Sequence, residues 1–384
     1  MEMTGRAIVH IDLDTFFVSV ERVLNSSLRG KPVIIGGSSD RGVVAACSYE
    51  ARTYGVHSAM PMKLCKRLCP NAIYIRGDMD QYSKYSHWVT DIISSKAPLF
   101  EKASIDEFYL DVSGMDRFYG CLQWSKELTQ SISHETGLPV SFGLTPNKTV
   151  SKIATGEAKP QGQKQVCNNE VRSFLNPLSI KKIPMLGPQT YKTLRGMGIA
   201  YIETLSAMPA ELMQQVLGSN GIMLWERANG IDNTPVVAYS EQKSIGTEDT
   251  FDSDSTDINR IKALLVRMTE KIAYQLRSKN KLTSCVTVKI RYSNFDTHTM
   301  QCRIPYTSCD HTLIPHVKEL FDKLYQRRML IRLVGVRLSH LVAGAYQINL
   351  FDDTSEMISL YQAIDRMRKR FGDDKVKRAV VPWK

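Results

Sequence analysis

Acidic residues stand at the ends of two segments that otherwise have the composition of buried strands. Asp12 follows an apolar run at 7–11, and the pair Asp106 and Glu107 leads into another at 108–112. Carboxylates are costly to bury unless a cation meets them. If the two strands are neighbours, three carboxylates would converge on one point. A pair of Mg2+ ions would suit that point, because hard cations take oxygen ligands and two metals are the usual device for in-line phosphoryl transfer. Salt-bridged surface acids are the alternative, and for a single acid at a strand end they are the better interpretation.

Length and composition limit the other possibilities. A chain of 384 residues with 43% hydrophobic residues is expected to form about two to four globular domains. It has no apolar run of roughly 18 residues, and its first ten residues lack a signal-peptide core, so we expect a cytoplasmic protein with no membrane partner. The eight cysteines form no CxxC pair, which favours reduced thiols over a zinc site or disulfides.

Positive charge is concentrated in the second half of the chain. The net charge is +11, of which residues 1–170 contribute +1 and residues 240–345 contribute +6. A near-neutral part that holds the acids, followed by a basic block, is typical of an enzyme with a polyanion-binding domain. A solvated basic surface without a partner is the alternative, since charge alone only somewhat favours nucleic acid.

Hydrophobic periodicity predicts three folded regions. Over residues 7–157 the order strand, helix, strand, strand, helix, strand indicates a split βαβ sheet with helices on one face. Residues 171–235 contain short helices and no convincing strand. A polar linker at 239–243 leads to a second α+β unit. Its expected helices are 257–278 and 313–325, and its expected strands are 284–292, 297–304 and 331–342.

Two of these regions carry possible DNA contacts. Residues 183–188, followed by a helix at 190–197, have the pattern of a helix–hairpin–helix, which offers backbone N–H groups to DNA phosphates. Met185 stands where the first glycine of that hairpin is expected, so a plain helical turn is an equal possibility. In the second unit, strand alternation predicts a sheet face that could follow a phosphate backbone or simply be solvated. Its basic residues are Lys289, Arg291, Arg303 and Arg337.

Several short segments, taken together, resemble one family closely. They are Ile11-Asp12-Leu13-Asp14-Thr15-Phe16-Phe17, Tyr49-Glu50-Ala51-Arg52, Ser104-Ile105-Asp106-Glu107, Lys152-Ile153-Ala154, Ala158-Lys159-Pro160 and Lys243-Ser244-Ile245-Gly246. In order and spacing they are similar to the motifs of the Y-family translesion DNA polymerases, and most of all to the DNA polymerase IV (DinB-like) branch. The likeness covers residues 7–160 and extends to about residue 345.

The resemblance implies an α+β multidomain fold with the architecture of a right-hand polymerase. A ferredoxin-like palm would combine residues 1–12 and 79–170, with small fingers at 13–78. A helical thumb containing the helix–hairpin–helix would occupy 171–235. An α+β little-finger domain that binds DNA would occupy 240–345, followed by a tail at 346–384.

The resemblance also implies the residues of a two-metal active site. Asp12, Asp106, Glu107 and the backbone carbonyl of Leu13 would hold two Mg2+ ions, for which Mn2+ can substitute. One ion would lower the pKa of the primer 3′-hydroxyl, and the other would bind the triphosphate and offset charge on the departing pyrophosphate. Asp14 lies on the same strand face as Asp12 but is not a metal ligand in the family, so we expect it to be structural.

Other residues match positions that bind the incoming nucleotide in the family. These are Phe16, Phe17, Tyr49, Arg52 and Lys159, of which the last three would grip the β- and γ-phosphates. Phe17 matches the steric gate, whose ring leaves no room for a ribose 2′-hydroxyl. Ala46 replaces the Ser or Thr that is common in the family, so we expect a lower nucleotide affinity or insertion rate.

Expected DNA and partner contacts extend along the rest of the chain. The DNA-binding set comprises Lys152, Gly187, Lys243, Lys289, Arg291, Arg303 and Arg337. Gln347-Ile348-Asn349-Leu350-Phe351 resembles the bacterial sliding-clamp-binding pentapeptide, in which Gln347 would fill a polar pocket and Leu350 and Phe351 an apolar one. The end of the last strand is the alternative interpretation. Residues 357–371 have helical spacing, and a docking helix, a DNA contact and a helix packed on the body all fit them.

We therefore expect template-directed, error-prone translesion synthesis without proofreading, by a monomer that binds primer-template DNA, dNTPs and the clamp. The four parts leave no room for an exonuclease domain. A non-catalytic DNA-binding scaffold would predict a broken carboxylate set, whereas Asp12, Asp106 and Glu107 are all present. Another two-metal palm enzyme, such as a nucleotide cyclase, would predict no thumb, no basic little finger and no clamp motif.

Overall fold

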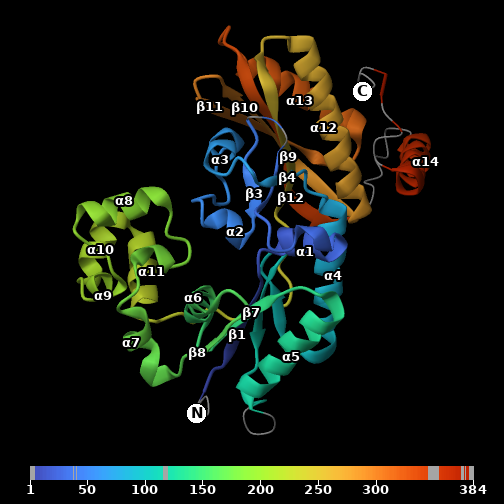
Figure 1. Ribbon diagram of the computed structural model, residues 1–384. Coiled ribbons are helices and arrows are strands. Elements are labelled where there is room, and N and C mark those ends of the chain that lie inside the picture. Colours follow the sequence, from blue (N-terminus) through green and yellow to red (C-terminus); the bar gives the residue numbers. More distant parts are fainter. Residues whose placement is uncertain are drawn as a thin grey trace. The chain divides into compact units, whose positions relative to one another are not determined.

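The computed structural model describes residues 5–37, 39, 41–115, 120–344, 354–372, 376, 378 and 379. The chain forms two compact units, Met1–Ser240 and Glu241–Lys384. The first is built around a five-stranded sheet and the second around a four-stranded sheet (Figure 1). Each unit has its own cluster of buried hydrophobic residues.

The central sheet of the first unit brings together strands that are far apart in the sequence. Its order is β5 (Phe100–Lys102), β6 (Glu107–Asp111), β1 (Ile8–Leu13), β7 (Val140–Thr145) and β8 (Gln163–Gln165). β1 is antiparallel to both β6 and β7, and Asp12 lies opposite Glu107. The two acid-bearing strands are therefore neighbours.

Alternate residues of β1 face two different layers of helices. Val9, Ile11 and Leu13 share a buried cluster with α4 (Met79–Lys96) and α5 (Cys121–Thr136). α6 (Lys148–Ala158) covers the opposite face, where it contacts His10. The expectation of helices on one face only is wrong. Gly143 on β7 lets α6 approach, since a Cβ there would lie 2.4 Å from a helix carbonyl oxygen.

A small subdomain follows β1. It begins with α1 (Phe16–Leu24) and contains a three-stranded sheet in the order β3 (Val44–Cys47), β2 (Val33–Gly36) and β4 (Ile73–Ile75). Two short helices, α2 (Tyr49–Arg52) and α3 (Met62–Leu68), pack with these strands around the buried Ile34 and Cys47.

Residues 171–235 form a helical subdomain, as their sequence indicates. Its helices are α7 (Val171–Leu175), α8 (Pro188–Gly196), α9 (Ile202–Ser206), α10 (Ala210–Leu217) and α11 (Ser219–Ala228), with a 3-10 turn at Ile180–Lys182 before α8. The hairpin between that turn and α8 is present although it lacks its first glycine. Met185 adopts the left-handed φ of 65° that glycine would favour.

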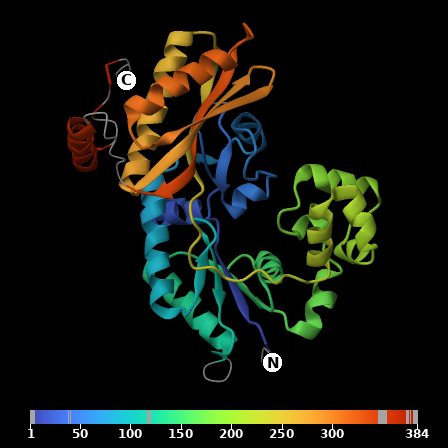
Figure 2. The same cartoon turned by 180° about the vertical axis from the view of Figure 1, so that it is seen from behind.

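The second unit is an antiparallel sheet covered on one face by helices. The strand order is β11 (Thr297–Thr307), β10 (Lys281–Tyr292), β12 (Ile331–Ala343) and β9 (Ser244–Ser255). α12 (Ile258–Ser278) and α13 (Asp310–Leu324) pack on the face that carries Val286, Val288 and Ile290 (Figure 2). The expected strands and helices are confirmed to within a few residues, but β9 is an additional strand. The sequence did not predict β9, because this edge strand buries few of its side chains and is therefore mostly polar.

The helix expected beyond the last strand is α14 (Thr354–Phe371), and it packs on the second unit. Arg277 of α12 is buried and holds it through two hydrogen bonds to Asp365, at 2.7 and 2.9 Å. The same guanidinium donates to Asp310 of α13 at 2.7 Å and lies 4.7 Å from the centroid of the Tyr361 ring. Among the three possibilities for this segment, packing on the body is the one observed.

Candidate active site

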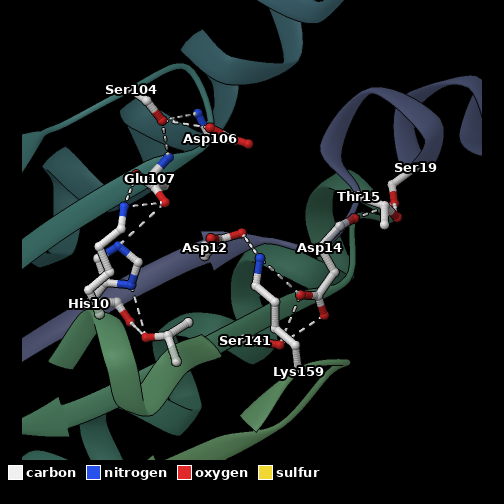
Figure 3. A network of polar contacts seen from close by, with 12 residues as sticks. His10, Asp12, Asp14, Thr15, Ser19, Ser104, Asp106, Glu107, Ser141 and Lys159 are labelled. Atoms are coloured by element: carbon white, nitrogen blue, oxygen red, sulfur yellow. Dashed lines mark hydrogen bonds and ion pairs between the residues drawn. The ribbon is translucent and has the colours of Figure 1, made fainter. Parts of the chain in front are cut away.

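The carboxylates lie at one end of two paired strands (Figure 3). Asp12 near the end of β1 faces Glu107 at the start of β6, and the Leu13 amide donates a hydrogen bond to the Asp106 carbonyl at 3.1 Å. Asp12 and Glu107 are half-buried, with side chains 13% and 22% exposed. The strand register therefore places three acids, from two distant segments, within one small region.

Two lysines meet these acids. Lys152, on α6, donates to both carboxylate oxygens of Glu107 at 2.6 Å. Lys159, just beyond the same helix, donates to Asp12 and lies 3.9 Å from Asp14. The sequence associated Lys152 with DNA and Lys159 with phosphate, but it did not predict that both would contact the acids.

Burial affects the protonation of Asp12 more than the charges around it do. Burial raises the pKa of Asp12 to about 7, and the nearby charges of Glu107 and Asp106 add to this, whereas Lys159 acts in the opposite direction. The contact with Lys159 therefore does not offset the effect of burial on Asp12. A divalent cation would favour the ionised carboxylate, and the oxygen donors present are those that hard cations prefer.

The three carboxylates do not converge on a single point, contrary to the expectation from the sequence. Within the described residues, no three Asp, Glu, His or Cys side chains form a group that could hold a metal ion. Glu107 is held by Lys152, and Asp106 accepts a hydrogen bond of 2.6 Å from the Ser104 hydroxyl. These side-chain partners separate acids that the strands themselves bring together.

Asp14 has a different environment from Asp12, although both side chains point to the same face of the chain. It is 1% exposed and accepts hydrogen bonds from the Ser141 hydroxyl at 2.8 and 3.0 Å. The backbone N–H of Gln161 donates a hydrogen bond to the Asp14 carboxylate at 2.6 Å. Its acceptor oxygens are thus used within the fold, in agreement with the structural role expected for it.

Tyr49 and Arg52 share one face of α2, as their spacing predicts. The Arg52 guanidinium lies 4.9 Å from the centroid of the Tyr49 ring, and Ser48 caps the helix. Burial, followed by the nearby charge of Asp14, raises the pKa of Tyr49 to about 12, so its hydroxyl stays protonated and can donate to an anion. A cavity of about 450 Å³ adjoins Tyr49, Asp14 and Arg22.

The two phenylalanines after β1 have different surroundings. Phe16 is 3% exposed and belongs to the core of the first unit. Phe17 is only partly buried, and its ring stacks on that of Tyr82 with centroids 4.4 Å apart and planes 13° apart. The Tyr82 hydroxyl donates to Glu21 at 2.6 Å. Phe17 therefore has a fixed ring that is partly accessible.

The basic residues expected on the second unit share one face of its sheet. Strand register places Lys289, Arg291, Arg303 and Arg337 opposite the helix-covered face. Arg303 and Arg337 are exposed, while Lys289 donates to both carboxylate oxygens of Glu248 at 2.9 Å. A hollow of about 370 Å³ on this face is lined by residues that include Lys289 and Arg337.

The remaining predicted residues are not gathered with these sites. Lys243 is exposed just before β9. Gly187 is the N-cap of α8, where the first amides of a helix have no partner within the helix. The clamp-motif residues Gln347, Ile348, Leu350 and Phe351 lie outside the described residues.

Sequence reasoning missed three residues beside the carboxylates. Ser104 holds Asp106, and the buried His10 lies 4.0 Å from Glu107 and contacts Thr155 of α6. A signal for His10 was available, because residues two apart on a strand share a face. No comparable signal pointed to Thr155, since its contact depends on how α6 crosses the sheet.

Comparisons with known proteins agree with this geometry. The model of the impB/mucB/samB family matches residues 11–156, and that of its C-terminal domain matches residues 242–350. DNA polymerase IV of Dehalococcoides mccartyi strain BAV1 is 37% identical over 374 residues, which are 96% of each chain. DNA polymerase IV of Desulfatibacillum aliphaticivorans is 33% identical over 99% of this chain and 98% of its own.

Solved structures that resemble this chain are also DNA polymerases. A Y-family DNA polymerase chimera of Dbh and Dpo4 is 27% identical, with a TM-score of 0.80 over 88% of this chain and 100% of its own. The insertion ternary complex of Dbh DNA polymerase is 26% identical, with a TM-score of 0.62 and the same coverage.

The fold and the comparisons define a DNA-directed DNA polymerase, a nucleotidyltransferase that acts on DNA and deoxynucleotides. The chain belongs to the Y family of DNA polymerases, in its DNA polymerase IV branch, and its activity is translesion DNA synthesis. Polymerases of this family depend on divalent metal ions. Within the described part of the chain, no helix is long and apolar enough to cross a membrane.

Proposed function

We propose that this chain joins a dNTP to a primer 3′-hydroxyl by two-metal catalysis, without proofreading. Two Mg2+ ions, for which Mn2+ can substitute, would be held by Asp12, Asp106, Glu107 and the carbonyl oxygen of Leu13. They would activate the attacking hydroxyl and offset charge on the leaving pyrophosphate. The observation that carries this proposal is the pairing of β1 with β6, which places Asp12 opposite Glu107 and next to Asp106, with the ammonium groups of Lys159 and Lys152 on Asp12 and Glu107.

Lys159 would exchange partners when substrate binds. Its ammonium group contacts Asp12 in the structure, and a cation on that carboxylate would release it toward the β- and γ-phosphates. Tyr49 and Arg52, which share one face of α2, would complete the grip on the triphosphate. Such charge-assisted contacts are about twice as strong as neutral hydrogen bonds.

The partly accessible ring of Phe17 would act as the steric gate. Because it stacks on Tyr82, it cannot turn aside easily to admit a ribose 2′-hydroxyl. Phe16, which lies in the core, would support the nucleotide site through packing.

DNA would be bound along the parts of a polymerase hand. We assign residues 1–12 and 79–170 to the palm, 13–78 to the fingers, 171–235 to the thumb and 240–345 to the little finger. Lys152, once a cation replaces it on Glu107, would turn toward the DNA backbone. The other proposed contacts are Gly187, Lys243, Lys289, Arg291, Arg303 and Arg337, since cationic groups and helix amides suit phosphates.

The tail at 346–384 would place the polymerase on its template. Gln347, Ile348, Leu350 and Phe351 would bind the bacterial sliding clamp as an extended peptide. We propose that the protein is a cytoplasmic monomer when it is not bound to the clamp.

Primer extension with the purified chain, Mg2+ and four dNTPs tests this proposal. The key variant is Asp106→Ala, with Asp111→Ala as its control, because Asp111 lies at the other end of β6 and its carboxylate accepts hydrogen bonds from Ser113 there. Metal-dependent extension by wild type and Asp111→Ala, lost in Asp106→Ala, is the expected result. Extension that survives Asp106→Ala would refute the assignment of the ligands. DNA binding without any extension would refute the catalytic function and favour the alternative of a non-catalytic DNA-binding scaffold.

A further inference from the structure

A cavity lies between the end of α12 and the middle of α14 in the second unit. Its volume is about 790 Å³, which is within the range typical of ligand-binding sites. The lining residues are Tyr274, Arg277, Ser278, Asn280, Gln362, Asp365, Arg366 and Lys369. The basic residues of the sheet face are not among them, so this cavity is separate from the DNA contacts proposed above.

The α14 side of the cavity carries two cations. Gln362, Arg366 and Lys369 follow one another at spacings of four and three residues, so they share one face of the helix. Arg366 and Lys369 are exposed, and within the described residues neither side chain forms an ion pair or a hydrogen bond. Charges that line a concave surface attract anions strongly, because the walls of the cavity focus their field.

The carboxylates of this region already have cationic partners. Asp365 accepts two hydrogen bonds from Arg277, at 2.7 and 2.9 Å. The same guanidinium donates to Asp310 at 2.7 Å. Glu270 is buried and lies 3.1 Å from the Arg378 guanidinium. None of these carboxylates pairs with the two cations on the α14 side of the cavity.

A third cation is buried next to the cavity wall. Arg368 is 5% exposed, and its guanidinium carbon lies 5.9 Å from the centroid of the Tyr274 ring, which lines the cavity. Its Nη2 atom donates to the Val376 carbonyl oxygen at 3.1 Å, whereas Nε and Nη1 have no hydrogen-bond partner within the described residues. Buried donors nearly always have a partner, so these N–H groups point to an anion that the region can bind.

In and beside the cavity, the described cations outnumber the carboxylates. The cations are Arg277, Arg366, Arg368, Lys369 and Arg378, and the carboxylates are Glu270, Asp310 and Asp365. An excess of positive charge around a hollow suits a ligand with several phosphate groups.

We propose that the cavity between α12 and α14 binds the phosphate groups of single-stranded DNA. Arg366 and Lys369 would each contact a phosphate, and the side-chain amides of Asn280 and Gln362 would donate hydrogen bonds to the same strand. A flexible single strand can enter a cavity between two helices, whereas a duplex is too stiff to bend into it. A DNA polymerase meets single strands because its template is unpaired ahead of the primer. None of these residues belongs to the proposed catalytic site.

Binding of a short oligo(dT) to the full chain, followed by fluorescence anisotropy at several salt concentrations, tests the site. The key variant combines Arg366→Gln with Lys369→Gln. The matched control combines Lys271→Gln with Arg370→Gln, which removes two exposed charges from α12 and α14 outside the cavity lining. A third variant, Arg366→Lys with Lys369→Arg, exchanges the two side chains and keeps both charges.

The dependence of affinity on salt reports the number of phosphate contacts. Each contact with a single strand contributes about 0.7 to the slope of log affinity against log salt concentration. We therefore expect the key variant to lower this slope by about 1.4, and the control and the exchanged variant to keep the slope of wild type. Primer extension on a template with a short overhang should be the same in all of these proteins, which shows that the variants fold.

Hydrogen exchange supplies a local measurement that distinguishes the possible sources of phosphate. Oligo(dT) should slow amide exchange at 274–280 and 362–369 in wild type but not in the key variant. A blunt duplex of the same length, dTMP and inorganic phosphate should leave exchange in these segments unchanged.

Three outcomes would overturn the inference. The first is a salt slope that falls no more in the key variant than in the control. The second is unchanged exchange at 274–280 and 362–369 when oligo(dT) is bound. The third is slowing by the duplex, dTMP or inorganic phosphate that equals the slowing by oligo(dT), because the cavity would then have a different ligand.

Discussion

Asp12→Asn is expected to stabilise the metal-free protein while it abolishes catalysis. The side chain is 13% exposed, and its pKa rises from an ordinary value of 3.8 to about 7 in the folded state. The folded protein therefore holds a proton on Asp12 that the unfolded chain releases at a lower pH. Folding becomes less favourable as the pH rises through this window.

The size of the effect follows from the two pKa values. Each pKa unit between folded and unfolded states corresponds to 1.36 kcal/mol. A rise from 3.8 to about 7 thus costs about 4 kcal/mol of stability above pH 7, about 2 kcal/mol at pH 5 and almost nothing below pH 3. The amide of the Asp12→Asn variant carries no charge at any pH, so its advantage over the wild-type carboxyl should grow by roughly 2 to 3 kcal/mol between pH 5 and pH 8.

Urea unfolding in EDTA at pH 5 and pH 8 measures this difference. Tryptophan fluorescence suits the assay, because Trp88, Trp124 and Trp225 all lie in the first unit. Asp14→Asn is the matched control. Asp14 accepts hydrogen bonds from the Ser141 hydroxyl and the Gln161 amide, so losing an acceptor there should destabilise by about 1 to 3 kcal/mol.

Two results would refute this reasoning. The first is an Asp12→Asn protein that is no more stable than wild type at pH 8 without metal. The second is a gain of equal size at pH 5 and pH 8, which would mean that the stabilisation does not come from the ionisation of Asp12.

Three further predictions concern other parts of the chain. Phe17→Ala should raise ribonucleotide incorporation relative to deoxynucleotide incorporation by about 10- to 200-fold, measured as the ratio of kcat/KM values, and an unchanged ratio would exclude Phe17 as the gate. Met185→Gly should raise the free energy of unfolding by about 1 kcal/mol, because the φ of 65° strains any residue with a Cβ; a lower thermal midpoint would contradict this. Arg277→Ala should lower the stability of the second unit by about 3 to 5 kcal/mol, since it leaves Asp310 buried without its partner, and calorimetry with no shift would count against it.

Much of the fold follows from local patterns. Alternation in β10 correctly predicts that Val286, Val288 and Ile290 face a core while Lys289 and Arg291 face the other side. That the strands of Asp12 and Glu107 are neighbours was only a hypothesis from the sequence, and the pairing of β1 with β6 places them together. β9 was not predicted, because an exposed edge strand needs no apolar side to be stable and so has no periodic signal.

For the candidate site, too, some features follow from the sequence and others only from the tertiary structure. The sequence by itself determined which side chains we propose for the chemistry, since the carboxylates, the ring proposed as the gate and the proposed phosphate-binding cations follow motifs that can be read along the chain. Only the tertiary structure decided which groups meet them. Gly143 admits α6 to the second face of the sheet, and that helix brings Lys152 to Glu107 and Thr155 to His10. The physical reason is that periodicity records which face of an element is buried, whereas a contact between side chains depends on where two elements cross.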